Sequence, residues 1–130
     1  MIVVDTNIFL EYLLGQEKAA DCLTAIESIV DTEEESRISS FSLHSIEVIL
    51  TRKNLVKELK SFLNVLDNLF FLKVYYTTVK EEKEVLDVMA KTGLDFDDSI
   101  QYYLAKKLNA ELLTLDKHFD KFKDIKVIRP

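Results

Sequence analysis

The chain is organised around the stretch from Gly93 to Asp116, GLDFDDSIQYYLAKKLNAELLTLD. This stretch predicts a loop that carries carboxylates, then a helix, then a short apolar strand that ends at an acid. The start of the chain repeats the second half of this design, because the apolar run 2–4 leads directly into Asp5. An ionised carboxylate beside apolar surroundings costs several kcal/mol unless a cation or hydrogen bonds compensate it. Two strands that each deliver an aspartate therefore indicate a cation site.

The composition fits a globular protein with one domain over residues 1–130. A hydrophobic content of 48 % and a charged content of 31 % are ordinary for such a chain, and its length is common for one domain. Only two glycines and one proline are present, whereas an all-β fold uses many of both at its turns. The single Cys22 excludes an internal disulfide.

No segment of the sequence is suited to a membrane or to secretion. No run approaches the roughly 18 apolar residues that span a bilayer. Asp5 interrupts the opening apolar run, and no basic residue precedes that run, which disfavours a signal peptide. We therefore expect a cytoplasmic protein without a membrane partner.

Apolar periodicity divides the chain into alternating strands and helices. The expected strands are residues 1–5, 37–40, 73–76, 111–115 and 126–128. The expected helices are residues 8–13, 17–30, 43–52, 55–72, 78–92 and 97–108, and one more helix is expected between the last two strands. This alternation predicts an α/β fold, a three-layer α/β/α sandwich with a mainly parallel central sheet.

Polar residues and a glycine mark the helix ends. Thr6 and Asn7 offer N-cap chemistry for the first helix, and Ser42 offers it for the third. Gly93 is expected to end the fifth helix. The third and fourth helices are expected to form a hairpin, which is a candidate surface for a partner.

Four carboxylates are expected at one rim of the sheet. Ligands of open parallel sheets bind beyond the carboxyl ends of the strands, where Asp5 and Asp116 follow their strands. Asp98 begins a helix near the same rim, and the longer side chain of Glu47 can reach it. Close carboxylates repel by about 4 kcal/mol per pair at an effective dielectric of roughly 20, so a cation is needed to hold them together.

The chemistry of these ligands favours a hard divalent cation. All-oxygen ligation favours Mg²⁺ or Mn²⁺ over zinc, and His44 and His118 do not form a metal-ligand pair by their spacing. A hard cation that keeps several waters suits phosphate chemistry, because it activates water and offsets the charge that develops on phosphate oxygens.

Four short motifs resemble the PIN-domain family in order and spacing. They are Val4-Asp5-Thr6-Asn7, Ser42-x-x-Ser45-Ile46-Glu47, Asp98-Ser99-Ile100 and Thr114-Leu115-Asp116-x-x-Phe119. The resemblance covers essentially the whole chain, and the length matches the stand-alone, VapC-like toxin branch.

The resemblance implies a Mg²⁺- or Mn²⁺-dependent ribonuclease that hydrolyses RNA phosphodiester bonds with a metal-activated water. The acids that it assigns to catalysis and metal binding are Asp5, Glu47, Asp98 and Asp116. Asn7 and Thr114 would orient carboxylates or the attacking water. Members of this branch usually form homodimers and are neutralised by a small cognate antitoxin, so the chain is expected to be the toxin of a type II toxin–antitoxin pair.

The choice of the third acid stays open. Asp95, Asp97 and Asp98 all lie in the segment LDFDDS, and Asp98 is preferred because a small residue and then an aliphatic one follow it, as in the family. Asp95 or Asp97 would then be the helix N-cap.

The net charge of −6 has the wrong sign for non-specific nucleic-acid binding. RNA contact is therefore expected at a local basic rim, which a dimer can complete. The candidate cations by sequence proximity are Arg52, Lys53, Lys117 and Lys121.

Other functions fit the sequence less well. A phosphotransfer enzyme of the haloacid-dehalogenase type needs an acid where this chain has Asn7, and a receiver domain needs an aspartate after the strand at 73–76, where Thr77 stands. A non-catalytic PIN-like scaffold and an RNA-processing PIN nuclease remain alternatives to the toxin.

Overall fold

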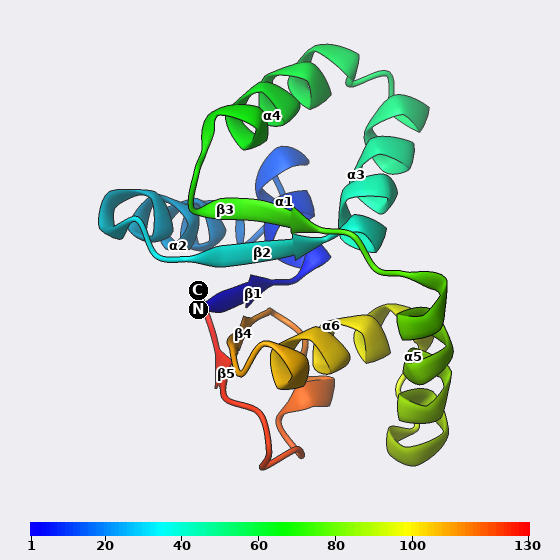
Figure 1. Cartoon of the computed structure of the whole chain (residues 1–130). Coiled ribbons are helices and arrows are strands. Elements are labelled where there is room, and N and C mark those ends of the chain that lie inside the picture. The colour runs from blue at the N-terminus through cyan, green and yellow to red at the C-terminus, as the bar shows by residue number, and fades with distance from the viewer.

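The structure is a computed structural model that describes all 130 residues, and its centre is a five-stranded sheet in the order β3-β2-β1-β4-β5 (Figure 1). The strands are β1 Ile2–Val4, β2 Ser36–Ser39, β3 Leu72–Tyr75, β4 Glu111–Leu113 and β5 Val127–Ile128. The helices are α1 Thr6–Leu13, α2 Ala19–Thr32, α3 Ser40–Arg52, α4 Val56–Asn68, α5 Val79–Thr92 and α6 Phe96–Lys107, with a 3₁₀ turn, η1, at Lys117–Phe119. All neighbouring strands are parallel. The predicted α/β fold is confirmed.

The three layers follow from the alternation of side chains along each strand. On β1, Val4 packs into the core with α1 to α4, whereas Val3 packs on the opposite face with α5 and α6. On β4, Leu113 and Leu112 divide in the same way. Figure 1 shows α1 and α2 behind the sheet and α6 in front of it. Strands buried on both faces are continuously apolar, which is why the runs at 2–4 and 112–113 lack a wet side.

The strand order reverses beside β1. Along the chain the sheet grows from β1 to β2 and β3 on one side, and then β4 and β5 are added on the other. Val4 is in register with Leu113, and the backbone N–H of Asp5 donates to the Leu113 carbonyl at 2.9 Å. The carboxyl ends of β1 and β4 therefore flank the crevice at which open α/β sheets bind ligands.

Several helix ends differ from the sequence prediction. The helix expected at 55–72 ends at Asn68, because Leu69 is extended and Leu72 already pairs with Ser36 in the sheet. Ser39, not Ser42, caps α3: its Oγ accepts from the Ser42 N–H at 2.9 Å.

Two shorter segments also differ. Asp5, not Thr6 or Asn7, holds the N-cap position of α1, without a side-chain cap bond. The helix expected between the last two strands is only the 3₁₀ turn η1. Gly93 does end α5, in the left-handed conformation with φ of 72°, as predicted. None of the helices combines the length and the apolar character that crossing a bilayer requires.

Candidate active site

Asp5 is the most deeply buried acid at the rim, with 2 % of its surface exposed. Its Oδ2 accepts hydrogen bonds from Thr114 Oγ1 at 2.6 Å and from Asn7 Nδ2 at 3.0 Å. Burial raises the pKa of Asp5 from 3.8 to about 7, the Thr114 bond opposes the rise, and the charges of Asp97 and Asp98 add to it. Such a rise corresponds to about 4 kcal/mol against the ionised form. Asp5 therefore lacks a positive partner within the protein.

Asn7 and Thr114 join the end of β1 to the segment after β4. Asn7 Oδ1 accepts from the Leu115 N–H at 3.2 Å, and its Nδ2 lies 3.3 Å from Thr114 Oγ1. Thr114 Oγ1 also accepts from the Asp116 N–H at 2.9 Å. The two residues chosen from the sequence as supporting groups thus both bond Asp5, and Thr114 also bonds the backbone of Asp116.

The three aspartates of LDFDDS have separate places. Asp95 is the N-cap of α6, and its Oδ1 accepts from the Asp98 N–H at 2.9 Å. Asp97 accepts from Gln101 Nε2 at 3.2 Å, and burial raises its pKa. Asp98 is 8 % exposed and faces Asp116, and burial followed by the charge of Asp116 raises its pKa to about 6. The geometry favours Asp98 as the third acid of the rim.

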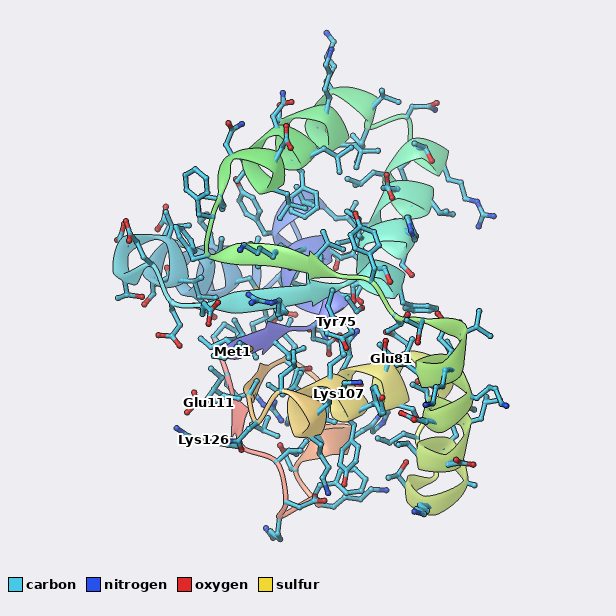
Figure 2. The ribbon with its side chains drawn as sticks, in the orientation of Figure 1. Met1, Tyr75, Glu81, Lys107, Glu111 and Lys126 are labelled. Atoms are coloured by element: carbon cyan, nitrogen blue, oxygen red, sulfur yellow. The ribbon has the colours of Figure 1, made fainter.

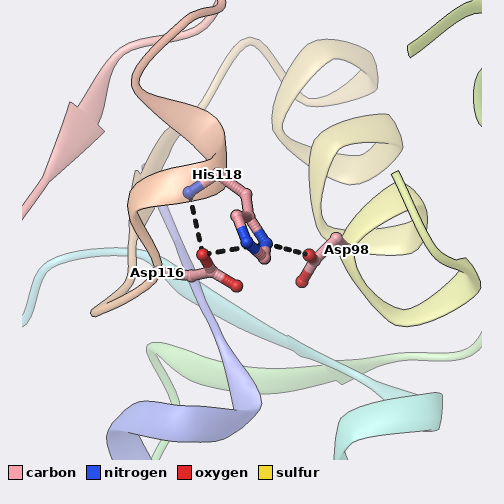
Figure 3. A group of neighbouring side chains, drawn as sticks. All are labelled: Asp98, Asp116 and His118. Atoms are coloured by element: carbon pink, nitrogen blue, oxygen red, sulfur yellow. Dashed lines mark hydrogen bonds and ion pairs between the residues drawn. The ribbon is translucent and has the colours of Figure 1, made fainter. Parts of the chain in front are cut away.

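His118 completes a group with Asp98 and Asp116 (Figure 3). Its Nδ1 lies 3.2 Å from Asp116 Oδ1 and 3.4 Å from Asp98 Oδ2. One nitrogen of the imidazole and one oxygen of each carboxylate all lie within 4.8 Å of one another. The spacing between His44 and His118 gave no indication that His118 joins the acids. The sequence feature that could have indicated His118 is its position two residues after Asp116. The 3₁₀ turn η1 brings the two residues together, and Asp116 Oδ1 accepts from the His118 N–H at 2.8 Å.

Asp5 and Glu47 both lie outside the group of Asp98, Asp116 and His118, but Asp5 is joined to Asp116 through Thr114, and Glu47 is not. Glu47 lies on α3, and its Oε1 is 2.8 Å from His44 Nδ1, with 34 % of the side chain exposed. Asp5, Asp98 and Asp116 meet at the rim, while Glu47 is paired on its own helix. Its catalytic role stays a prediction.

A buried hydroxyl network lies directly behind the acids. Ser42 Oγ is 2.6 Å from Thr6 Oγ1 and 2.9 Å from Ser39 Oγ, and it accepts from Gln101 Nε2 at 2.8 Å. Since Thr6 follows Asp5 and Gln101 also binds Asp97, the network joins both acidic segments to α3. The sequence did not reveal this network, because small polar residues on a helix do not show whether they are buried or which residues they contact.

The donor set fits a divalent cation. Carboxylate oxygens are ligands for Mg²⁺ and Mn²⁺, and an imidazole nitrogen suits transition metals as well. The raised pKa values of Asp5 and Asp98 are the mark of negative charge that a cation would compensate. Asp98 and Asp116 would hold the ion, with His118 beside them and Asp5 behind.

Solved structures share this fold. A toxin–antitoxin complex from Klebsiella pneumoniae aligns with a TM-score of 0.71 at 18 % identity, over 98 % of this chain and 96 % of that chain. Mycobacterium tuberculosis VapC20, described as a sarcin–ricin loop cleaving toxin, gives a TM-score of 0.75 at 13 % identity, over 97 % and 99 %. VapBC2 from Rickettsia felis, bound to a DNA fragment from its promoter, gives 0.72 at 20 % identity, over 99 % and 98 %.

The sequence itself matches a known family. No curated protein matches the chain as a relative. The family model of the PIN domain, however, matches residues 2–125, which includes every residue of the rim described above. The chain therefore belongs to the PIN-domain family.

Proposed function

We propose that the chain is a metal-dependent ribonuclease that hydrolyses RNA phosphodiester bonds, and that its 130 residues act as one nuclease domain. The observation that carries this proposal is the meeting of Asp5, Asp98 and Asp116 at the point where the strand order reverses, with the pKa values of Asp5 and Asp98 raised to about 7 and about 6. A site built only for stability would not gather uncompensated carboxylates, because each one lowers the free energy of unfolding.

The residues at the rim have distinct roles in this proposal. Asp98 and Asp116 hold Mg²⁺ or Mn²⁺, and Asp5 and Glu47 complete the acidic set. When bound, the ion offsets the charge that develops on the phosphate oxygens and makes an attacking water more acidic. Thr114 keeps Asp5 oriented through the 2.6 Å hydrogen bond.

Asn7 and His118 have different roles beside the acids. Asn7 fixes Asp5 and the Leu115 backbone together. His118 is exposed over 72 % of its side chain, so a substrate phosphate can reach it from solvent. An imidazole there can donate a proton to the phosphate or to the leaving oxygen.

RNA would contact the cations nearest to the rim. Lys117 begins η1 directly after Asp116, and Lys121 follows η1 within two residues. Arg52 and Lys53 lie at the far end of α3, more than three helical turns from its start at the rim. With a net charge of −6, Lys117 and Lys121 are the better candidates for RNA contact. A homodimer would carry two copies of each.

We further propose that the chain is the toxin of a type II pair with a small antitoxin. The proposal is supported by the descriptions of the structural neighbours as VapC toxins and toxin–antitoxin complexes. An apolar groove of about 470 Å³ between α1, α2 and α4 offers a surface for such a partner, and 11 of its 13 lining residues are hydrophobic. Tyr12 and Val65, which line it, are 42 % and 53 % exposed. The groove includes one arm of the predicted α3–α4 hairpin.

The test is RNA cleavage by the purified chain with and without a divalent ion. Cleavage of single-stranded or structured RNA is expected with Mg²⁺ or Mn²⁺ and not with EDTA, and Asp5→Asn is expected to abolish it with the fold retained by circular dichroism. Asp21→Asn, which changes an exposed acid of α2, is the matched control. An Asp5→Asn protein that cleaves as fast as the parent would contradict the assignment. Growth arrest on expression separates a toxin from a processing nuclease.

A further inference from the structure

We infer that Arg129 is a positioning residue for the candidate active site, because it fixes the backbone that presents Asp116. The inference rests on the proposed function for its consequence, since the geometry matters to catalysis only if Asp116 binds the metal. Arg129 is 13 residues from Asp116 in sequence and follows the last strand, β5. Nothing in its local sequence marks it as part of a site.

The segment that carries Asp116 has left the sheet. β4 ends at Leu113, and the last bond to β5 runs from the Thr114 N–H to the Ile128 carbonyl at 3.2 Å. Beyond it, the next two N–H groups are bound by side chains: that of Leu115 by Asn7 Oδ1 at 3.2 Å, and that of Asp116 by Thr114 Oγ1 at 2.9 Å. Side chains therefore fix the backbone of Leu115 and Asp116, which is no longer paired in the sheet.

Arg129 binds the backbone carbonyls of the same segment. Its Nη1 donates to the Thr114 carbonyl at 2.9 Å and its Nη2 donates to the Asp116 carbonyl at 3.0 Å. Nη2 also pairs with the Asp120 carboxylate, just past η1. One guanidinium thus bridges the residues at both ends of the segment and the turn that carries His118.

The planar fork of arginine is what this geometry requires. A guanidinium presents several N–H donors in a fixed plane, whereas a lysine ammonium is a compact point charge on a flexible stem. Lysine at this position would reach one carbonyl and leave the other unbound. Loss of one anchor would let Asp116 move relative to Asp98, and a shift of an oriented ligand weakens metal binding even though the ligand itself remains.

A matched control lies just before the same strand, β5. Lys126 directly precedes β5 and pairs with Glu111 at the opposite end of the sheet (Figure 2). That pair joins two side chains at the surface and touches no backbone of the rim. Glutamine at either position removes one positive charge and one surface ion pair, but only the change at Arg129 also removes bonds to the Asp116 segment.

The experiment compares Arg129→Lys and Arg129→Gln with Lys126→Gln in the full chain. The dissociation constant for Mn²⁺ alone is measured by calorimetry, and amide hydrogen exchange is measured without metal. Both Arg129 variants are expected to bind Mn²⁺ about 10-fold more weakly, with faster exchange at Leu115 and Asp116 and an unchanged melting temperature for Arg129→Lys. Lys126→Gln is expected to match the parent in all three. At saturating Mn²⁺, the Arg129 variants are expected to lose kcat and keep KM.

Mn²⁺ affinity in Arg129→Lys equal to that of the parent would overturn the inference while leaving the nuclease proposal intact. A parent chain that neither binds Mn²⁺ nor cuts RNA would overturn both. If both changes at position 129 prevent folding, Asp120→Asn removes the carboxylate that orients the guanidinium and spares Arg129 itself. Weaker Mn²⁺ binding by Asp120→Asn supports the inference, and parental binding overturns it.

Discussion

The hydroxyl of Thr114 donates to Asp5 Oδ2 at 2.6 Å, although 109 positions separate the two residues in sequence. The Thr114 hydroxyl oxygen also accepts from the Asn7 side chain and from the Asp116 N–H. A hydroxyl has one donor and two acceptor positions, and Thr114 uses all three at the rim. The buried carboxylate of Asp5 and the backbone of Asp116 are thereby fixed by one small side chain.

Thr114→Val, which keeps the shape and removes the hydroxyl, is expected to lower RNA cleavage by about 10- to 100-fold. The cause is the loss of the bond that opposes the raised pKa of Asp5, together with the loss of an anchor for Asp116. Thr114→Ser restores the hydroxyl and is expected to cleave at close to the parental rate. Equal rates for the valine and serine variants at saturating Mn²⁺ would speak against this role.

Asp5→Asn is expected to make the metal-free chain more stable above pH 7. The folded pKa of about 7 lies above the ordinary value of 3.8, so the folded state binds more protons between these values and its stability falls as the pH rises through them. Asparagine removes this loss. Urea unfolding in EDTA should give a free energy of unfolding about 1–2 kcal/mol above that of the parent at pH 8, with the difference shrinking toward pH 4.

The control for this measurement is Asp21→Asn, which should track the parent at every pH. An Asp5→Asn protein that is less stable than the parent at pH 8 would show that the carboxylate is compensated within the fold.

Glu81 is expected to stabilise the chain in a pH window set by its own titration. Hydrogen bonds from Lys107 at 2.8 Å and Tyr75 at 2.6 Å, with Thr78 at the helix cap, hold the pKa of Glu81 at about 2, below its ordinary 4.5 (Figure 2). The stabilisation is therefore complete above pH 4.5 and is lost as the pH falls from 4.5 through 2.

Glu81→Gln should lower the free energy of unfolding by about 1–2 kcal/mol at pH 6, and the difference should shrink below pH 4. Glu111→Gln, which breaks the more exposed pair with Lys126, should cost less than half as much. Unfolding by urea at pH 6 and pH 3 measures both. A constant difference across this range would mean that the charge of Glu81 is not what stabilises the fold.

The apolar groove is expected to be the antitoxin surface. Val65→Glu places a charge in the groove, so the proposed antitoxin, co-expressed with this chain, should no longer co-purify with it, because burying an unpaired charge is costly. Leu86→Glu changes a residue of α5 with nearly the same exposure, 55 % against 53 %, and should retain the partner. Both variants should still cleave RNA. Retention of the antitoxin by Val65→Glu would place the contact elsewhere.

Glu47 is expected to act in the reaction even though it pairs with His44. Glu47→Gln should lower cleavage by at least about 10-fold, whereas His44→Ala, which removes only its partner on α3, should leave the rate near that of the parent. The measurement is single-turnover cleavage at saturating Mn²⁺. Similar rates for the two variants would reduce the acidic set to Asp5, Asp98 and Asp116.

The sequence predicted what depends on local pattern. Apolar runs that end at an acid placed Asp5 and Asp116 at one rim, because all parallel strands present their carboxyl ends on the same side. The small and aliphatic residues after Asp98 favoured it over its neighbours, and the structure turns Asp98 toward Asp116 while Asp95 caps the helix.

The features that the sequence did not reveal depend on which elements become neighbours. His118 and Arg129 meet Asp116 only because a 3₁₀ turn and β5 fold back beside β4. The Ser42 network forms only when α3 and α6 pack on β1. The end of α4 was misplaced because the apolar pattern continues through Leu69 into β3, and burial in a helix or in a strand leaves the same pattern.

The central place of β1 in the sheet has a consequence for synthesis. β1 is made before its partner β4, so Asp5 must wait for Thr114, which is made 109 residues later. At about 5–20 residues per second, that interval lasts roughly 5–20 s. A chain truncated before Thr114 should accordingly be inert toward RNA. In the proposed nuclease, the acidic site is therefore not assembled until Thr114 and its neighbours have been synthesised.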